Sequence, residues 1–174
     1  MHFNLKNIAL SLNLVLMAGV SQAHVGFDND QAVQGSYKRF ALKVPHGCGK
    51  LATNAITIHI PEGIQGAKPM PKADWTTSTH TAKLSTPYDN HNAQITEDVD
   101  AVTWSNGTLP SHFYDEFVFQ AKVAAHTGTM HFSVDQTCDQ ETIHWDAPSH
   151  DAAHPAATLQ ITEQATDTGN AHQH

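Results

Sequence analysis

The sequence predicts an all-β protein, and three observations favour that class. Apolar and polar residues alternate with period two through much of the chain, as they do in strands with one buried face. Gly, Pro and Asn separate these runs at short intervals. Beyond residue 23, no window of helical length carries an apolar stripe. About eight short strands of this kind are typical of an immunoglobulin- or fibronectin-like β-sandwich, with a barrel as the lesser alternative.

The predicted strands are the segments in which the alternation is clearest. Phe40, Leu42 and Val44, for example, alternate with other residues and are followed by a proline. In chain order, we expect strands at 25–27, 40–44, 56–60, 76–83, 101–104, 117–121, 130–134 and 142–145. We expect turns at Pro45, 61–63, 105–107 and 127–128. Asn106-Gly107 is more simply a hairpin turn than a glycosylation site.

Two segments interrupt this pattern. Residues 86–99 are polar and contain Pro87, which predicts a long surface connection. Residues 149–174 are rich in Ala, Thr and His, which predicts a flexible, disordered tail, with 157–162 as an alternative last edge strand. The expected organisation is therefore one β-sandwich domain at 24–148 and a histidine-containing tail at 149–174.

The first 23 residues have the features of a signal peptide. An apolar run at 8–20 follows Lys6, and small residues at Ser21 and Ala23 form an A-x-A-like cleavage site. The run is too short to span a bilayer. We therefore expect a cleaved leader at 1–23 and a periplasmic or extracellular protein that begins at His24.

The net charge indicates which partners are disfavoured, and the two cysteines indicate a disulfide. The net charge of −8 becomes −9 once Lys6 is lost, which disfavours nucleic acid and anionic membranes and permits cation binding. The two cysteines, Cys48 and Cys138, would enter an oxidising compartment. Their separation lacks CxxC or CxxxC spacing, so a disulfide is favoured over a copper-thiolate pair.

A histidine at the mature N-terminus can chelate a metal ion through two nitrogens, the α-amine and imidazole Nδ1. The α-amine has a pKa of roughly 7.7–8.0, so it loses its proton to a metal ion easily. Nitrogen-rich sites favour Cu(II) among the divalent first-row ions. The third mature residue is Gly26 rather than histidine, so His24 needs further ligands from elsewhere in the chain. The alternative is an arbitrary first residue with no metal role.

Two other side chains are candidates for this site. Glu116 begins a predicted strand and faces away from Phe117, although acidic residues often flank strands only to stay solvated. Trp145 is by default a core aromatic, but its ring can stack over a cation or exclude water from a metal. Asp115 and Glu116 point to opposite faces and cannot form a catalytic dyad.

The remaining histidines are scattered, and the sequence has no HExxH, GxSxG or P-loop motif. Histidines inside predicted strands are interpreted as surface or hydrogen-bonded residues: His59, His80, His131 and His144. Those in the predicted tail could bind Cu or Zn weakly: His150, His154, His172 and His174.

The order of several short motifs resembles the YcnI-like copper-binding family over nearly the whole of 24–148. In chain order they are Ala23-His24-Val25, Ser36-Tyr37, Val44-Pro45-His46-Gly47-Cys48, 58–61, Lys68-Pro69-Met70-Pro71-Lys72 with Trp75, Val102-Thr103-Trp104, Phe113-Tyr114-Asp115-Glu116-Phe117, Gln136-Thr137-Cys138 and Trp145-Asp146-Ala147-Pro148. The resemblance implies an exported immunoglobulin-like sandwich that binds Cu(II) with one histidine. Carried over by motif, the ligand set is His24, Glu116 and Trp145.

These observations predict an exported, non-catalytic Cu(II)-binding protein that stores, delivers or receives copper. Its partners would be the copper ion and exported or membrane copper-handling proteins. One alternative is a copper-dependent oxidative enzyme, which needs a second imidazole such as His112, His131 or His144. The other is a metal-free immunoglobulin-like interaction module, because this fold class hosts many functions.

Overall fold

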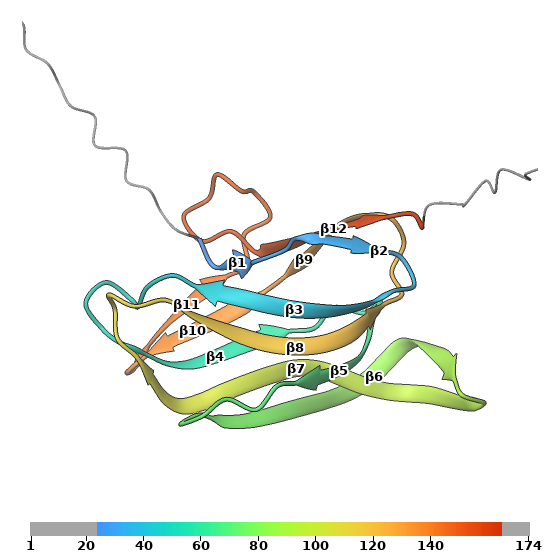
Figure 1. Ribbon diagram of the computed structural model, residues 1–174, viewed down its shortest axis with the longest axis horizontal. Coiled ribbons are helices and arrows are strands. Elements are labelled where there is room, and N and C mark those ends of the chain that lie inside the picture. The colour runs from blue at the N-terminus through green and yellow to red at the C-terminus, as the bar shows by residue number, and fades with distance from the viewer. Residues whose placement is uncertain (1–23, 165–174) are drawn as a thin grey trace, which may run out of the picture.

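The computed structural model describes residues 24–164, and its regular elements there are all β-strands (Figure 1). They are β1 (Gly26–Phe27), β2 (Gln31–Val33), β3 (Tyr37–Val44), β4 (Thr53–His59), β5 (Ile64–Pro69), β6 (Thr76–Asn90), β7 (Ala93–Leu109), β8 (Asp115–Val123), β9 (Gly128–Phe132), β10 (Val134–Cys138), β11 (Glu141–Trp145) and β12 (Ala157–Thr162). The predicted all-β class is confirmed. Over 24–164 we find no helix of the length and apolarity that a membrane crossing requires. The predicted leader, 1–23, and residues 165–174 lie outside the described part.

The strands form three sheets. One has the order β1-β3-β8-β5, the second β11-β10-β4-β7-β6, and the third β2-β12-β9. In Figure 1, β3 of the first sheet lies above β7 and β6 of the second, and β4 passes behind β8. Strand β9 continues through Ser133 into β10, so the segment predicted as one strand at 130–134 serves two sheets in succession.

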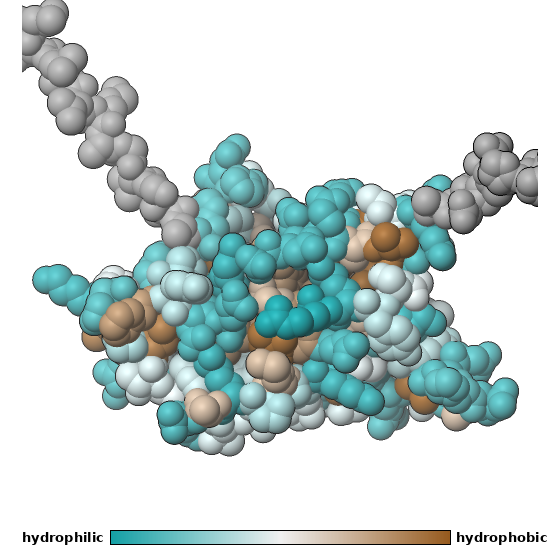
Figure 2. All heavy atoms as spheres, in the orientation of Figure 1, coloured by the Kyte–Doolittle hydropathy of each residue, from teal (hydrophilic) through white to brown (hydrophobic). Residues whose placement is uncertain are grey.

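Aromatic side chains fill the core between the sheets. Phe40 and Phe119, on neighbouring strands, stack with ring centroids 4.5 Å apart. The edge of Phe27 packs on Phe132 at 4.9 Å, which joins β1 to β9. Trp104 of β7 is fully buried against Phe117 of β8, 5.6 Å away, so the two larger sheets interlock. Burying each phenylalanine contributes about 1.5–3 kcal/mol. The face seen in Figure 2 is mostly hydrophilic, with hydrophobic residues in separate patches.

A disulfide links Cys48 and Cys138, as predicted, with their Cα atoms 5.9 Å apart. Cys48 lies in the loop after β3, and Cys138 is the last residue of β10. The bond therefore connects a loop of the first sheet to a strand of the second.

The predicted turn at 105–107 is wrong, because these residues lie inside β7. Asn106 has a φ of 58°, and the register of β4 on β7 shifts nearby, between Thr53 and Ala55, so the pair forms a strand irregularity rather than a chain reversal. Gly107 is required there for another reason: a Cβ atom would lie 2.0 Å from Cδ2 of Trp75. The Asn-Gly pair thus makes room for an indole.

The predicted surface connection at 86–99 is also wrong, because β6 and β7 form a long hairpin through it. His91 and Asn92 make the reversal with φ values of 47° and 65°, as in a two-residue type I′ turn. Much of this part of the hairpin is exposed on both faces, so its sequence lacks the apolar alternation that identifies a half-buried strand.

The predicted boundary at Pro148 differs from the structure. Residues 146–156 form a loop, and 157–162 form β12, which lies between β2 and β9 rather than at an edge. Ala157, Leu159 and Ile161 are buried, whereas Gln160 is exposed. The segment has the Ala- and Thr-rich composition of a polar tail. The alternation at 157–162 covers only six residues, which is too short to outweigh that composition.

Candidate functional site

His24 lies two residues before Gly26, the first residue of β1, and is held by buried neighbours. Val25 and Phe27 point into the core, and Gly26 pairs with Lys43 of β3. Alternation along the strand therefore places His24 on the outward side with Gly26, where it is half-buried. A short strand anchored by a core phenylalanine thus fixes the position of a surface imidazole.

Trp145 lies close to His24. It is the last residue of β11, opposite Val134, and only 3% of it is exposed. Its indole Nε1 donates a hydrogen bond of 3.0 Å to Oε1 of the buried Gln136. Its ring centroid is 6.4 Å from that of His24, at 61° between the planes. The structure therefore brings together two of the three side chains that the sequence predicts as ligands.

Glu116, the third, lies on β8, in the sheet that contains β1 and not in the sheet of Trp145. It pairs with Lys43, which in turn pairs with Gly26, so two strand spacings of about 4.8 Å separate its backbone from β1. It faces outward, because Phe117 faces the core. Its Oε2 is 3.6 Å from Nη2 of Arg39, and among residues 24–164 it forms no ion pair with His24. The structure does not bring Glu116 into contact with the other two.

Two histidines that the sequence assigned to a tail lie beside this pair. They belong to the loop 146–156, which connects β11 to β12 and stands near the start of β1 in Figure 1. The ring of His150 is 5.4 Å from that of His24, and the ring of His154 is 5.0 Å from that of Trp145. The sequence does contain an indication of this. Both histidines follow Trp145 within nine positions, so a short loop that folds back would bring them near the Trp145 ring.

A small pocket of about 140 Å³ lies between β1, the loop 146–156 and β12. His24, His150 and Asp30 contribute polar side chains to its lining, and Pro155 and Ala156 contribute apolar ones. Both histidines therefore border one hollow.

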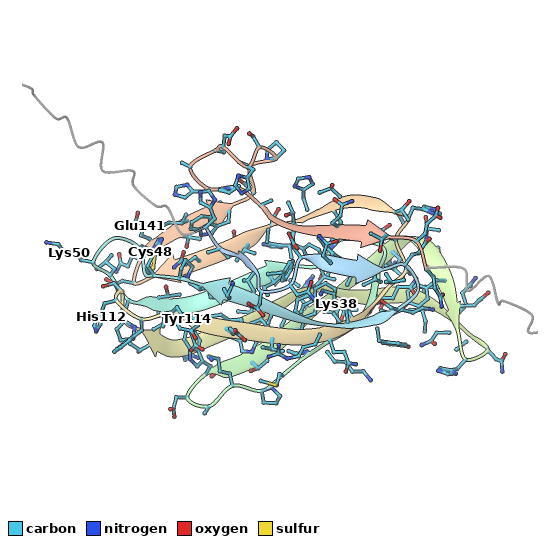
Figure 3. All side chains as sticks on the ribbon, turned by 45° about the horizontal axis from the view of Figure 1, so that its top comes forward. Lys38, Cys48, Lys50, His112, Tyr114 and Glu141 are labelled. Carbon is cyan, nitrogen blue, oxygen red and sulfur yellow. A yellow bond between two sulfur atoms is a disulfide. The ribbon has the colours of Figure 1, made fainter. Side chains whose placement is uncertain are left out.

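The histidines proposed as a second imidazole lie elsewhere. His112 packs on Phe113 at 4.3 Å, and Figure 3 shows it at one end of the molecule, near Tyr114. His131 is exposed on β9, opposite Thr158. His144 directs Nδ1 to Oδ1 of Asp135, 2.6 Å away, on the outward face of the second sheet. None of the three has a ring contact with His24 in the described region.

Asp135 is the centre of a separate histidine group. It accepts hydrogen bonds from His144 and from Nε2 of His59, at 2.6 and 2.9 Å. Burial raises the pKa of Asp135, but the hydrogen bonds and positive charge of the two imidazoles outweigh burial and hold it below its usual range. Both imidazoles therefore hydrogen-bond one partly buried carboxylate on the sheet surface.

No three His, Cys, Asp or Glu side chains within 24–164 are arranged to hold a metal ion. Side chains alone therefore do not form a conventional metal centre there. A centre at His24 needs a donor of another kind, and a free α-amine on that residue is such a donor. The donor chemistry around His24 fits Cu(II) on that condition.

Comparison with known proteins gives a family and a fold. A family described as "Domain of unknown function (DUF1775)" matches residues 24–161. A crystal structure of an uncharacterized protein from Nocardia farcinica, described as immunoglobulin-like, is 25% identical and has a TM-score of 0.58. That match covers 79% of this chain and 97% of the other, which agrees with the predicted immunoglobulin-like fold.

Two other solved structures resemble the chain more weakly. One is BslA, described as a bacterial hydrophobin, at 13% identity and a TM-score of 0.42, covering 82% of this chain and 94% of that one. The other is a non-cellulosomal cohesin from the archaeon Archaeoglobus fulgidus, at 13% identity and a TM-score of 0.35, covering 80% and 90%. Neither bears on function, and among curated protein sequences none matches this chain. Because the family match runs from His24 into β12, the chain belongs to the DUF1775 family.

Proposed function

We propose that this protein is an exported, non-catalytic Cu(II)-binding protein of copper homeostasis, which binds copper through His24 once that residue is the N-terminus. The observation that carries the proposal is the position of His24: anchored beside β1, half-buried, with its ring 6.4 Å from Trp145. The family match also begins at His24, the residue that follows the predicted cleavage point. The disulfide supports export, because such bonds persist in oxidising compartments.

His24 would supply two nitrogens, its α-amine and Nδ1. These are donors that Cu(II) prefers, and the amine explains why the side chains of 24–164 need not form a cluster of three. Trp145 would provide an apolar wall that limits access of water to the ion. Its buried hydrogen bond to Gln136 holds the ring in place.

Glu116 is the proposed carboxylate ligand, on the motif resemblance. It faces the same outward side of the sheet as Gly26, which supports access to the region of His24. Its ion pair with Arg39 is long and partly exposed, so it opposes such a role only weakly. An oxygen donor would neutralise part of the charge of the bound ion.

Processing is the first test. The mature protein is purified from the exported fraction and its mass is measured intact. A mass that corresponds to residues 24–174 agrees with the proposal. Any other N-terminus contradicts it, because only cleavage before His24 frees the required amine.

Copper titration of the matured protein is the second test, with chelator competition as the measurement. We expect one tight Cu(II) site, and we expect a form with one alanine ahead of His24 to bind at least about 10- to 100-fold more weakly. Glu116→Gln should also weaken binding, whereas Glu97→Gln, on the distant hairpin, should not. Equal tight binding by the matured and extended forms would defeat the proposal.

A copper-dependent oxidative enzyme is a second candidate. The observation that favours it is the imidazole of His150 beside His24, because such an enzyme needs a second nitrogen side chain. The discriminating measurement is oxygen consumption by the copper-loaded protein with ascorbate as reductant. Sustained consumption above that of free copper would support the enzyme, and its absence would support storage or delivery.

A further inference from the structure

We infer that His150, carried by the loop 146–156, is a second imidazole ligand of the copper centre at His24. This inference rests on the proposed function, the copper site at His24, and extends it. The sequence assigns His150 only the weak metal binding of a tail histidine, and the family resemblance gives it no place in the ligand set. Its starting observation is the pair of rings, whose centroids are 5.4 Å apart with an interplanar angle of 78°.

The spacing of the rings fits two imidazoles that share one ion. Metal–imidazole nitrogen bonds of about 2.0 Å put each ring centre roughly 3 Å from the metal, so two such rings have centres roughly 4.5–6.5 Å apart. The observed separation falls inside this interval. The distance between the ring centroids is therefore compatible with both imidazoles binding one ion.

The loop that carries His150 is held closed at its base. Ala147 donates a hydrogen bond from its backbone nitrogen to the carbonyl of His154, and Ala156 donates one to the carbonyl of Ala147. Both ends then continue into β11 and β12. Because the ends are fixed, binding by His150 orders only a short segment, which keeps its entropic cost small.

The pocket beside β1 supports a shared site. His24 and His150 both line it, together with the exposed Asp30. His150 is itself exposed, so its nitrogens are open to an incoming ion. His154 contacts the ring of Trp145 instead and does not line this pocket, which assigns it a packing role rather than a ligand role.

The chemistry follows from the donor count. The α-amine and Nδ1 of His24 with one nitrogen of His150 make three nitrogen donors, a set that favours Cu(II) over the other divalent first-row ions. His150 would also fasten the loop over the ion when it binds. The loop would therefore be less open to proteases in the copper-loaded protein than in the metal-free protein.

The experiment compares matured wild type with His150→Ala, His154→Ala and His24→Ala. Cu(II) affinity is measured by chelator competition, and the number of bound imidazoles by pulsed electron paramagnetic resonance. We expect His150→Ala to lose at least about tenfold in affinity, because even supporting residues of a metal site are worth that much. Its spectrum should change from two imidazoles to one. His154→Ala, the matched control in the same loop, should keep both signals.

Three results would overturn the inference: an unchanged imidazole count in His150→Ala, an unchanged affinity in that variant, or an equal loss in His154→Ala, which would indicate a general effect of the loop. In any of these cases the function proposed for His24 stands if His24→Ala still abolishes tight binding. If His24→Ala binds as wild type does, the proposed function itself fails. Thermal unfolding of each variant checks its fold, and the exposure of both loop histidines predicts little change in stability.

Discussion

At the scale of single residues, the side chain of Gln136 connects the core to Trp145. Gln136 is fully buried, and its Nε2 donates to the carbonyl of His46 at 2.7 Å and to Oγ1 of Thr53 at 2.8 Å. Its Oε1 accepts from the indole of Trp145. These three bonds fix the amide, and the amide in turn fixes the ring beside His24. Sequence patterns do not identify such a residue, because a strand position alone does not reveal its partners.

Substitution Gln136→Leu should therefore destabilise the fold and loosen Trp145. The indole N–H, the hydroxyl of Thr53 and the carbonyl of His46 would lose a partner, and each buried orphan costs about 1–3 kcal/mol. Urea unfolding measures the loss, and near-ultraviolet circular dichroism reports the indole. Gln120→Leu, at an exposed position of β8, is the control. Equal stability of the two variants would argue against the bonding network.

Asp135 makes stability depend on pH. Its pKa is lowered in the folded protein, so its contribution is present above the ordinary carboxyl value of 3.8 and is lost as the pH falls through the lower folded value. Asp135→Asn should accordingly lose less stability than wild type between pH 5 and pH 3. The difference is about 0.5 kcal/mol, because the group is partly exposed.

Urea unfolding at a series of pH values measures this difference. Asp89→Asn, exposed on the hairpin of β6 and β7, serves as the control and should follow wild type. Parallel profiles for wild type and Asp135→Asn would show that His59 and His144 do not act through this carboxylate.

At the scale of elements, β12 completes the third sheet. It pairs in parallel with β2 and antiparallel with β9, and its inward side chains join the main core. Through the loop 146–156 it also determines where His150 lies relative to His24. The positions of the histidines in that loop therefore depend on β12, a strand that the composition of residues 149–174 does not predict.

Leu159→Ala should cost about 2–5 kcal/mol, because it empties a fully buried position of β12. Gln160→Ala, its exposed neighbour, should cost far less, since it removes only the hydrogen bond from Thr129. Thermal or urea unfolding gives both values. Truncation after Pro148 should prevent folding altogether. A folded truncated protein would show that β12 is dispensable.

At the scale of the whole molecule, the disulfide closes a large covalent ring in the chain, which contains β4 to β9 and most of β10. It joins Cys48 to Cys138, which are 90 positions apart, and it links the region after β3 to the end of β10. Closing a loop of this length limits the unfolded chain more than it changes the folded one. The bond also lies near Gln136, since Cys138 follows it by two positions on the same strand.

Removing the disulfide by the double substitution of Cys48 and Cys138 to alanine should lower the free energy of unfolding by about 4.6 kcal/mol in the chain-entropy account. Urea unfolding of the variant, and of wild type with and without a thiol reductant, provides the measurement. Reductant should affect wild type alone. A variant as stable as wild type would contradict the entropic role.

The sequence by itself determined the all-β class, the principal buried strands and the half-cystine pair, because period-two alternation and cysteine chemistry are local signals. It also selected His24 and Trp145, whose proximity the fold then provides. Only the tertiary structure decided the long hairpin, the place of β12, and the neighbourhood of His24. That neighbourhood depends on pairings between segments more than a hundred residues apart, such as β2 with β12. A local pattern shows which side chains of a strand are buried. It does not show which distant strand pairs with it, because that depends on tertiary packing.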